Sequence, residues 1–452
     1  MKELFAWRYA CKMDRLRHGC FFEQMLREIA ERDRWTPQQF LEFQNEQLRI
    51  IVRHAASYVP YYRKIFFEYG INPNSINSIE DLKLLPILEK EPVRTDPTSL
   101  LDERLNPQKL SVGHTSGTTG TPLALYQDVT LNSTAFAYRD ARWRQVGSVQ
   151  RRISRSVSIG GRLVTAPWRT KPPFWVYNRR WNQLYMSSYH LSPRYLGYYV
   201  EKLREFKADY IEGYPSSLYS VAFYIIDKGL EPVPFKCCFT TAEMLFDYQR
   251  QAIKKAFCCR TYNQYGCGEQ VVFAAECREG SMHLSPEVGI VEVVDDNDKP
   301  VPYGQQGNLI CTSLINKVQP FIRYRIGDVG SLADGRCSCG SPLPILKSIE
   351  GRSEDVLITR DGRRIGRLDH VVYGIEGISL AQIIQEDYDR FCIRLVPSKE
   401  YNASTEKKVI ENLATRVGKA DIRVELVDEI ERTSAGKFQA VICKLNRKLF
   451  AG

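Results

Sequence analysis

The chain has 452 residues, of which 43% are apolar and 26% charged, so it is long enough for two or three globular domains. Its longest apolar runs are too short to cross a membrane, and residues 1–34 lack the apolar stretch of a signal peptide. These features predict a soluble, cytoplasmic protein. The net charge, 63 − 53 = +10, suits an anionic small molecule such as ATP, but also nucleic acid or an anionic membrane surface.

The first 35 residues carry no assignable motif, and a basic amphipathic helix lying on a membrane is one alternative for them. Thr36-Pro37 predicts a helix start, because proline is favoured just inside a helix N-terminus. Apolar residues from Leu41 to Ala55 follow at helical spacing, within a helical segment expected over residues 1–70. Several prolines then predict a loop-rich segment over 72–103.

The middle of the chain alternates strands and helices. Strands are expected at 210–213, 235–240 and 259–263, with helices from Ser216 or Ser217 to 229 and over 246–257. This alternation predicts parallel pairing with right-handed crossovers, and ligands bind beyond the carboxyl ends of such strands. The turns at 213–215, 241–243 and 265–269 are therefore expected to meet at one site.

Antiparallel strands precede a change of pattern after Asp355. Antiparallel strands are expected at 289–295 and 307–314, and a hairpin turn at 360–363 contains Asp361-Gly362. Strands at 380–385, 391–396 and 422–427 with a helix over 404–418 predict a small α+β domain. The fold class is α/β, with a large N-terminal domain (1–353) whose sheets are rich in parallel strands, joined by a hinge to a small C-terminal domain (354–452).

The strongest local signal is His114-Thr-Ser-Gly-Thr-Thr-Gly-Thr-Pro122. Two glycines and five hydroxyl residues lie in the eight consecutive positions 115–122. Glycine lets the backbone approach a polyanion, and N–H and hydroxyl groups then bind phosphate oxygens. No Gly-Lys-Ser/Thr follows, so this is not a Walker A loop. A polar surface turn is the alternative.

Five segments together resemble the adenylate-forming superfamily, which includes acyl-CoA synthetases, luciferases and adenylation domains. Thr115–Pro122 resembles its phosphate-binding loop, and Tyr265–Glu269 is similar to its Tyr-Gly-x-Thr-Glu segment. Tyr324–Asp328 resembles Tyr-Arg-Thr-Gly-Asp, Gly351–Asp355 the Gly-Arg-x-Asp-Asp hinge, and Arg432–Lys437 the C-terminal Arg-Thr-x-x-Gly-Lys. The five occur in the order of the superfamily.

Further segments indicate which branch of the superfamily the chain resembles. Tyr61-Tyr-Arg63, Leu85–Lys90 and Cys337-Ser-Cys-Gly340 resemble phenylacetate–CoA ligase-like proteins. Arg363–Asp369 and Ala381–Gln385 resemble the subgroup encoded with capsule or exopolysaccharide biosynthesis.

The resemblance implies a catalytic lysine, an arginine on ribose or phosphate, and a glutamate that ligates Mg²⁺. These three are Lys437, Arg352 and Glu269. ATP is expected at Thr115, Ser116, Gly117, Thr118, Thr119, Gly120, Ala242, Glu243, Tyr265, Gly266, Asp328 and Arg352. The acid pocket is expected at Tyr214, Pro215 and Gly266, and the aromatic segment 167–189 is expected to line or cover the acyl or acceptor pocket.

The chain departs from the superfamily in three places. Leu123 follows Pro122 of the loop, where the superfamily often has lysine, although some members have leucine as well. Gly268 replaces the threonine before the metal-binding glutamate, which removes one hydroxyl contact. The hinge carboxylate is Glu354 in place of aspartate, which keeps the charge. Members of the superfamily rotate the small domain about this hinge between half-reactions.

The thirteen cysteines are scattered and odd in number, which predicts reduced thiols or metal ligands. Cys277, His283, Cys337 and Cys339 form a candidate structural zinc set, with Cys311 as a competing ligand. Ordinary free thiols in loops are the alternative. Six others are expected to be buried small apolar residues: Cys237, Cys238, Cys258, Cys259, Cys392 and Cys443.

The expected function is activation of a carboxylic acid by ATP and Mg²⁺ to an acyl-adenylate, followed by acyl transfer to CoA. Transfer to an amine, for example one on a sugar, is the alternative, and a non-catalytic nucleotide-binding scaffold is a third. No nucleic acid is expected as a partner. The identity of the acid, the acceptor and the oligomeric state are left open by the sequence.

Overall fold

The computed structural model of this chain describes residues 2–114, 123–166, 168–352, 357–359, 364–365, 368–372, 375–433 and 436–445. Its contacts divide the chain into two compact units, each of which is described by itself. The first unit comprises residues 1–153, 178–181 and 262–349, and the second comprises 154–177, 182–261 and 350–452. Both combine sheets with helices, which confirms the α/β class. The domain boundary at 353/354 stays a prediction.

Helices dominate the start of the first unit. The predicted helix start is confirmed, because the Thr36 hydroxyl accepts from the Gln39 N–H at 3.3 Å and the Gln39 side chain accepts from the Thr36 N–H at 2.9 Å. The α-helices are α1 (Lys2–Arg17), α2 (Cys20–Arg32), α3 (Pro37–Tyr58), α4 (Pro60–Glu68), α5 (Lys90–Thr95) and α6 (Val129–Gly147). The 3-10 turns are η1 (Pro73–Ser75), η2 (Ile79–Leu84), η3 (Pro107–Lys109) and η4 (Arg179–Trp181). None of the described helices has the length and apolar character that a bilayer crossing requires.

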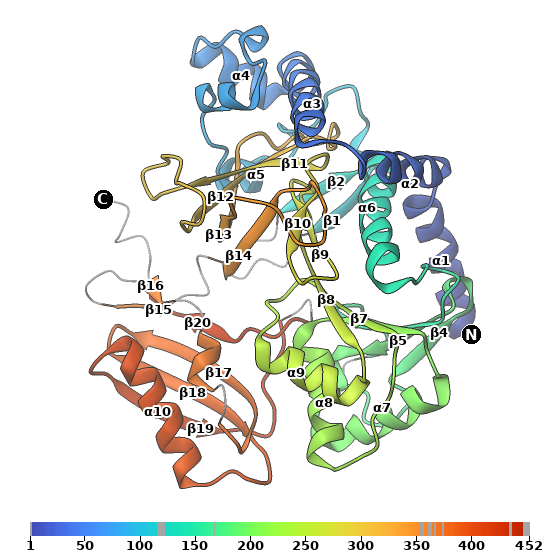
Figure 1. Cartoon of the computed structure of the whole chain (residues 1–452), viewed down its shortest axis with the longest axis vertical. Helices are drawn as coiled ribbons and strands as arrows, with labels where there is room; N and C mark the ends of the chain where they lie inside the picture. The colour runs from blue at the N-terminus through green and yellow to red at the C-terminus, as the bar shows by residue number, and fades with distance from the viewer. Residues whose placement is uncertain are drawn as a thin grey trace. The chain divides into compact units, whose positions relative to one another are not determined.

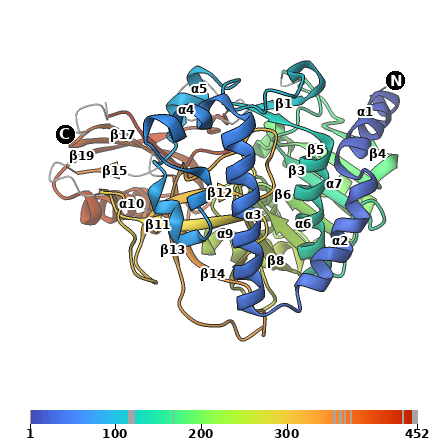
Figure 2. The same cartoon turned by 90° about the horizontal axis from the view of Figure 1, so that it is seen from above.

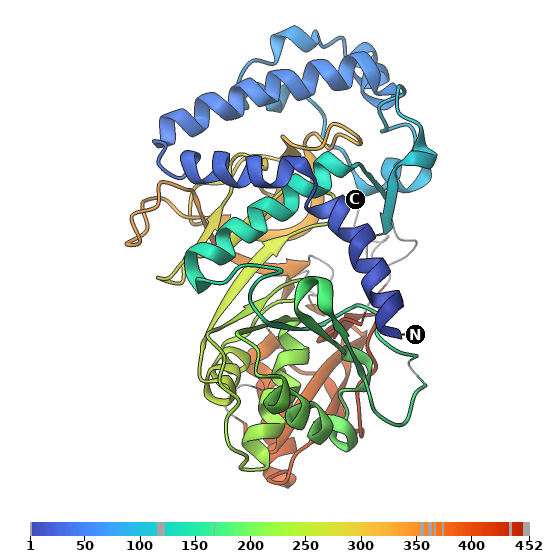
Figure 3. The same cartoon turned by 90° about the vertical axis from the view of Figure 1, so that its right-hand side faces the viewer.

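The second helix packs along α6, as Figure 3 shows. Phe22, Leu26 and Ile29 are buried on one face of α2, against Ala137 and Tyr138 of α6. A helix lying on a membrane would need this apolar face for lipid. In α2 the face is buried inside the protein, which assigns the N-terminal segment a structural role that the sequence left open.

Asp14 ties α1 to the same unit. Its carboxylate accepts from Arg180 Nη2 at 2.6 Å and from Trp181 Nε1 at 3.2 Å, and it lies 3.2 Å from Arg152 Nε. Arg180 holds the pKa of this carboxyl below its usual range, against the opposing effect of burial. The carboxylate therefore joins three segments that are far apart in the sequence.

Replacing this carboxylate is expected to loosen the N-terminal helices. We expect Asp14→Asn to lower the free energy of unfolding by about 1–3 kcal/mol, since it removes charge-assisted hydrogen bonds whose guanidinium ends are partly solvated. Urea unfolding and limited proteolysis within residues 1–35 measure the effect. Glu23→Gln, at an exposed position of α2, is the control. Wild-type stability and protease resistance in Asp14→Asn would contradict the role of Asp14.

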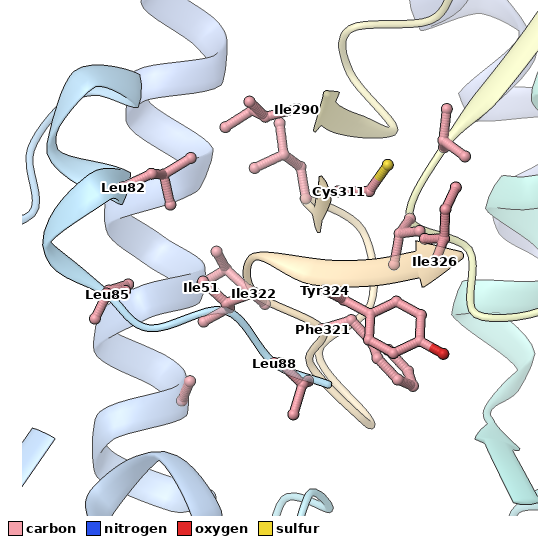
Figure 4. Close-up of a cluster of buried hydrophobic side chains, with 14 of the residues drawn as sticks. Ile51, Leu82, Leu85, Leu88, Ile290, Cys311, Phe321, Ile322, Tyr324 and Ile326 are labelled. Atoms are coloured by element: carbon pink, nitrogen blue, oxygen red, sulfur yellow. The ribbon is translucent and has the colours of Figure 1, made fainter. Parts of the chain in front are cut away.

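An antiparallel sheet forms the core of the first unit. The predicted pairing of 289–295 with 307–314 is confirmed, with Val291 opposite Cys311. Helix α3 lies beside the strands β11 to β13 (Figure 2). Its Leu48 and Ile51 belong to the same hydrophobic core as these strands, and Figure 4 shows Cys311 among apolar side chains of this core. In spatial order the strands are β11 (Gly289–Val294), β12 (Gly307–Ser313), β13 (Tyr324–Leu332), β14 (Ile345–Arg352), β10 (Met282–Leu284), β9 (Phe273–Glu276) and β8 (Arg260–Gly266).

Parallel strands form the centre of the second unit, as predicted. Strand β6 pairs in parallel with β7 on one side and β3 on the other, and helices α7, α8 and α9 accompany this sheet (Figure 1). In spatial order the strands are β7 (Cys237–Thr240), β6 (Tyr210–Gly213), β3 (Ser156–Gly160), β5 (Gln183–Ser187) and β4 (Trp175–Asn178). The helices are α7 (Pro193–Phe206), α8 (Pro215–Asp227) and α9 (Asp247–Phe257), with the 3-10 turn η5 (Ser188–His190).

Two local predictions for the second unit are wrong. Helix α8 begins at Pro215, so Ser216 and Ser217 lie in its buried first turn and do not cap it. Cys258 is exposed at the end of α9 with φ +50°, because the chain reverses there before entering β8. Of the other five cysteines expected in the interior, four are buried and Cys443 is partly exposed.

The end of the chain forms a four-stranded sheet with one helix. Strands β17 and β18 are antiparallel, whereas β19 and β20 join them in parallel. Helix α10 covers this sheet (Figure 1), with Val409 and Leu413 against Phe391 and Ile393. The elements are β15 (Leu357–Ile358), β16 (Arg364–Ile365), η6 (Leu368–Val371), β17 (Ile378–Asp387), β18 (Arg390–Pro397), α10 (Ala403–Val417), β19 (Asp421–Leu426) and β20 (Val441–Cys443). Strands β15 and β16 pair antiparallel on either side of the predicted turn, which lies outside the described residues.

Candidate active site

The predicted phosphate loop lies between two paired strands of the first unit. Strands β1 (Ser111–His114) and β2 (Ala124–Gln127) are antiparallel, with His114 opposite Ala124. Residues 115–122 connect them and lie outside the described residues, so the predicted phosphate contacts of Thr115 to Gly120 stay predictions. The two strands themselves pair as an antiparallel hairpin.

Two predicted nucleotide residues of the first unit contact each other. Tyr265, near the end of β8, donates its hydroxyl to Asp328 Oδ2 of β13 at 2.6 Å. Burial raises the pKa of the Tyr265 phenol, and the Asp328 charge adds to this, so the tyrosine stays a hydrogen-bond donor. The bond fixes the Asp328 carboxylate, which is the group expected to accept from the ribose hydroxyls.

A lysine that the sequence did not single out lies beside the same turn. Leu88 pairs with β13, accepting from the Arg325 N–H at 3.0 Å and donating to the Arg323 carbonyl at 2.9 Å. Lys90, two residues after Leu88, lies close to Gly327: a Cβ built on Gly327 would be 2.5 Å from Lys90 Nζ. The ammonium thus adds positive charge next to the Asp328 turn. Its only sequence signal was the resemblance of 85–90 to phenylacetate–CoA ligase-like proteins.

Glu269, the predicted magnesium ligand, is 7% exposed, and its Oε1 accepts from the Tyr324 hydroxyl at 3.1 Å. Magnesium is usually bound by one or two carboxylates together with waters and substrate phosphates, and one oriented carboxylate fits that pattern. The presence of Gly268 next to Glu269, where the superfamily has threonine, has a steric reason. A Cβ at Gly268 would lie 2.8 Å from Leu125 Cδ1, so Leu125 fills the space of the missing side chain.

Three further predicted positions stay untested. Gly266 ends β8 and pairs with Phe273 of β9. Arg352 is the last residue of β14, and its side chain is not among the described ones. Glu354, the predicted hinge, lies outside the described residues.

In the second unit, two of the three predicted turns meet. The Thr241 N–H donates to the Gly213 carbonyl at 3.3 Å, and the Ser216 N–H donates to Glu243 Oε2 at 3.1 Å. Ala242 between them has φ +69°, which a residue with a Cβ rarely adopts and which is common at functional turns. The third turn, 265–269, belongs to the first unit, and its meeting with the other two stays a prediction.

The predicted acid-pocket residues flank this junction. Tyr214 precedes α8, and burial raises the pKa of its phenol to about 12, with the Glu243 charge adding to the effect. Pro215 is buried at the first position of the helix. Their contact with an acid stays a prediction.

The aromatic segment 167–189 has a different role from the expected one over much of its length. Phe174 is fully buried in the core of the second unit, and Trp181 is buried in the first, where its ring meets His18 edge-on. Within the described residues, Trp168 is instead 83% exposed and Tyr189 lies near Gly436. An apolar residue can fill a core or line a pocket, and the sequence did not distinguish the two.

Lys437 lies on a loop that packs within the second unit. We call residues 432–438 the lysine loop; its residues 434 and 435 lie outside the described part. The Lys437 N–H donates to Thr433 Oγ1 at 3.1 Å, and the Thr433 N–H donates to the Lys437 carbonyl at 2.9 Å. These two bonds close a compact turn that fixes the backbone of the predicted catalytic lysine.

The predicted zinc ligands converge in the first unit. Cys277 follows β9, His283 lies on the adjacent β10, and Cys337 and Cys339 lie in the connection from β13 to β14. Their four ligand atoms all lie within 4.8 Å of one another. Cys311 is instead fully buried in the hydrophobic core (Figure 4) and is not part of this cluster.

The distances in the cluster match a tetrahedral zinc site. Cys277 Sγ and Cys337 Sγ are 3.8 Å apart, and Cys339 Sγ is 3.3 Å from His283 Nε2. Bonds of about 2.3 Å to sulfur and about 2.0 Å to nitrogen would place these pairs about 3.8 and about 3.5 Å apart. His283 Nδ1 is 3.1 Å from the Leu343 carbonyl, which orients Nε2 toward the thiols as in many metal-ligating histidines.

The thiol chemistry also fits a metal. Burial tends to raise the pKa of Cys337, but hydrogen bonds from Ser281, Cys339 and His283 outweigh it and lower the pKa to about 6. A thiolate is the form that binds zinc. Three sulfurs and one imidazole leave no open coordination position, so such a site would be structural.

The chain is similar to known proteins over most of its length. Residues 357–444 match the CapK C-terminal domain. The chain is 29% identical over 413 residues to protein CapK of Staphylococcus aureus, covering 88% of this chain and 87% of CapK. It is 25% identical over 339 residues to a phenylacetate-coenzyme A ligase of Thermus thermophilus, covering 70% and 71% of the two chains.

The fold is that of a known ligase structure. A 2-hydroxyisobutyryl-CoA ligase, solved in the postadenylation state with an acyl-AMP, superimposes with a TM-score of 0.66 at 21% identity, covering 90% of each chain. The chain is therefore homologous to CapK and to the phenylacetate-coenzyme A ligases, and it shares the fold of this 2-hydroxyisobutyryl-CoA ligase.

Proposed function

We propose that this protein activates a carboxylic acid with ATP, forming an acyl-adenylate and pyrophosphate, and then transfers the acyl group to CoA. The observation that carries the proposal is the 2.6 Å bond between Tyr265 and Asp328, which joins two motifs 63 residues apart. A nucleotide site requires these two motifs to lie at the same place. Glu269, held by Tyr324 in the same unit, supplies the carboxylate for the metal.

The chemistry requires charge neutralisation at phosphorus. The acid carboxylate attacks the α-phosphorus of ATP, the bond from that phosphorus to the bridging oxygen breaks, and pyrophosphate leaves with the electron pair. Magnesium, when bound, screens the phosphate charge. Asp328 accepts from ribose, Glu269 holds the cation, and the Lys437 ammonium donates to the carboxylate and α-phosphate oxygens as charge develops.

The acceptor divides the proposal into two alternatives. The phenylacetate-coenzyme A ligases among the relatives support CoA. CapK, however, covers 88% of the chain against about 70% for those ligases, and the chain carries the CapK C-terminal domain. The small domain is the part expected to serve transfer, so its CapK-like character keeps an amine acceptor, with an amide product, as the second alternative.

Pyrophosphate release with ATP, Mg²⁺ and a panel of aryl, short aliphatic and amino acids tests the first step, with hydroxylamine trapping the adenylate. Activity with one class of acid supports adenylation. Adding CoA or candidate amines then identifies the acceptor, as a thioester or an amide. If a protein that binds ATP releases no pyrophosphate with any acid of the panel, the result would favour a non-catalytic nucleotide-binding scaffold and contradict the proposal.

A further inference from the structure

The Glu243 carboxylate lies where three segments of the second unit meet. Its Oε2 accepts from the Ser216 N–H at the start of α8 at 3.1 Å, and its Oε1 accepts from the Phe438 N–H at 2.7 Å. Phe438 is the residue directly after Lys437. Both carboxylate oxygens are thus engaged by backbone N–H groups, one of them in the lysine loop.

An arginine of the lysine loop completes the junction. Arg432 Nη1 donates to the hydroxyls of Ser216 and Ser217 at 2.9 and 3.3 Å, and to the Gly436 carbonyl at 3.3 Å. Burial raises the pKa of Glu243 above its usual range, and the Arg432 charge and the N–H donors of Phe438 and Ser216 oppose that effect without cancelling it. A charge in such a place is tolerated when it is paired and hydrogen-bonded, as this one is.

Gly436 fixes the loop by close packing. It has φ +71°, and a Cβ there would lie 2.8 Å from Ser188 Oγ and 3.2 Å from both Tyr189 Cζ and Gly161 Cα. The backbone is therefore held on both sides of Lys437, by packing at 436 and by Glu243 at 438. Holding a catalytic group this way reduces the ordering needed at the moment of reaction.

We infer that Glu243 is a positioning residue that, with Arg432, holds the lysine loop so that Lys437 is placed for adenylation. This inference rests on the proposed function. The resemblance instead implies that Glu243 flanks the adenine, and the kinetic test below distinguishes these two roles. A contact that places Lys437 serves the adenylation step, and the transfer step has no need of it.

The test separates positioning from nucleotide binding. Glu243→Ala is expected to lower kcat for adenylation about 10–100-fold and to leave KM for ATP within about twofold, because the lysine is misplaced while the nucleotide contacts remain. Glu243→Gln, which keeps the shape but leaves one of the two N–H donors without an acceptor, is expected to lower kcat by a smaller factor, about 3–10-fold. Acyl transfer from a supplied acyl-adenylate should equal that of the wild type in both variants.

Two results would overturn the inference: a higher KM for ATP with kcat unchanged, which would indicate an adenine contact, or wild-type kinetics in Glu243→Ala. The double variant with Lys437→Ala should be no slower than Lys437→Ala alone, and a further loss would also contradict positioning. Thermal melting identifies a variant that fails to fold, and Glu243→Gln then carries the test.

A readout independent of activity keeps this inference separate from the proposed function. Hydrogen exchange followed by mass spectrometry is expected to show faster exchange in the peptide covering 432–440 of Glu243→Ala, since the Phe438 amide loses its acceptor. Unchanged exchange would show that Glu243 does not hold the loop. Absence of adenylation by the wild-type protein with any acid would instead contradict only the proposed function.

Discussion

Lys437→Ala is expected to lower kcat for adenylation by about 10²–10³-fold, the usual effect of removing one donor that stabilises transition-state charge. ATP binding should change little, because the Tyr265–Asp328 pair and Glu269 lie in the other unit and are untouched. The loop backbone should also persist, since its bonds to Thr433 and Glu243 come from main-chain groups. Pyrophosphate release under saturating ATP and acid measures kcat, and isothermal titration measures ATP affinity.

Lys408→Ala is the matched control for this variant. Lys408 is exposed on α10, within the same unit. Its replacement by alanine removes the same charge and side chain as Lys437→Ala. It should keep wild-type pyrophosphate release. Full activity in Lys437→Ala would show that the catalytic role of Lys437 is wrong, whereas equal losses in both variants would indicate a general charge effect.

The second large effect is expected at the cysteine–histidine cluster. One zinc ion per chain should be found by elemental analysis, and Cys337→Ser should lose it. If the site contributes even a third of the roughly 10–16 kcal/mol seen for zinc in small zinc domains, the melting temperature should fall by about 4–10 °C. The reason is that the metal cross-links the β9–β10 hairpin to the connection between β13 and β14.

Two other cysteines provide controls for this experiment. Cys258→Ser, at an exposed position, should keep both the zinc and the melting temperature. Cys311→Ala should keep the zinc while losing stability, because Cys311 is fully buried in the core. Wild-type protein without zinc, after expression and purification with zinc supplied, would exclude the metal site.

Local sequence patterns determined much of this protein. The Thr36-Pro37 helix start, the parallel strands of the second unit and the small C-terminal sheet all followed from capping, periodicity and turn chemistry. These signals act over a few residues, so the local structure that they favour does not depend on how the rest of the chain packs. The four zinc-ligand candidates were also identified in advance, because few combinations of cysteine and histidine spacing suit a tetrahedral site.

Errors arose where a residue type has two roles that only packing distinguishes. Ser216 was expected to cap a helix, but the chain enters α8 one residue earlier through Pro215, and the hydroxyl accepts from Arg432. Cys258 looks like its buried neighbour Cys259, yet a reversal of the backbone exposes it. Phe174 was expected at a pocket and instead fills a core.

The sequence by itself determined which motifs this protein has and in what order, and these motifs predict the residues that would carry adenylation. Only the tertiary structure decided what those residues contact. Glu243 and Phe438 are 195 residues apart, and a carboxylate in a turn has the same sequence signature whether it faces adenine or the protein. Partners at such distances depend on how sheets and loops pack together, and no local pattern specifies that packing.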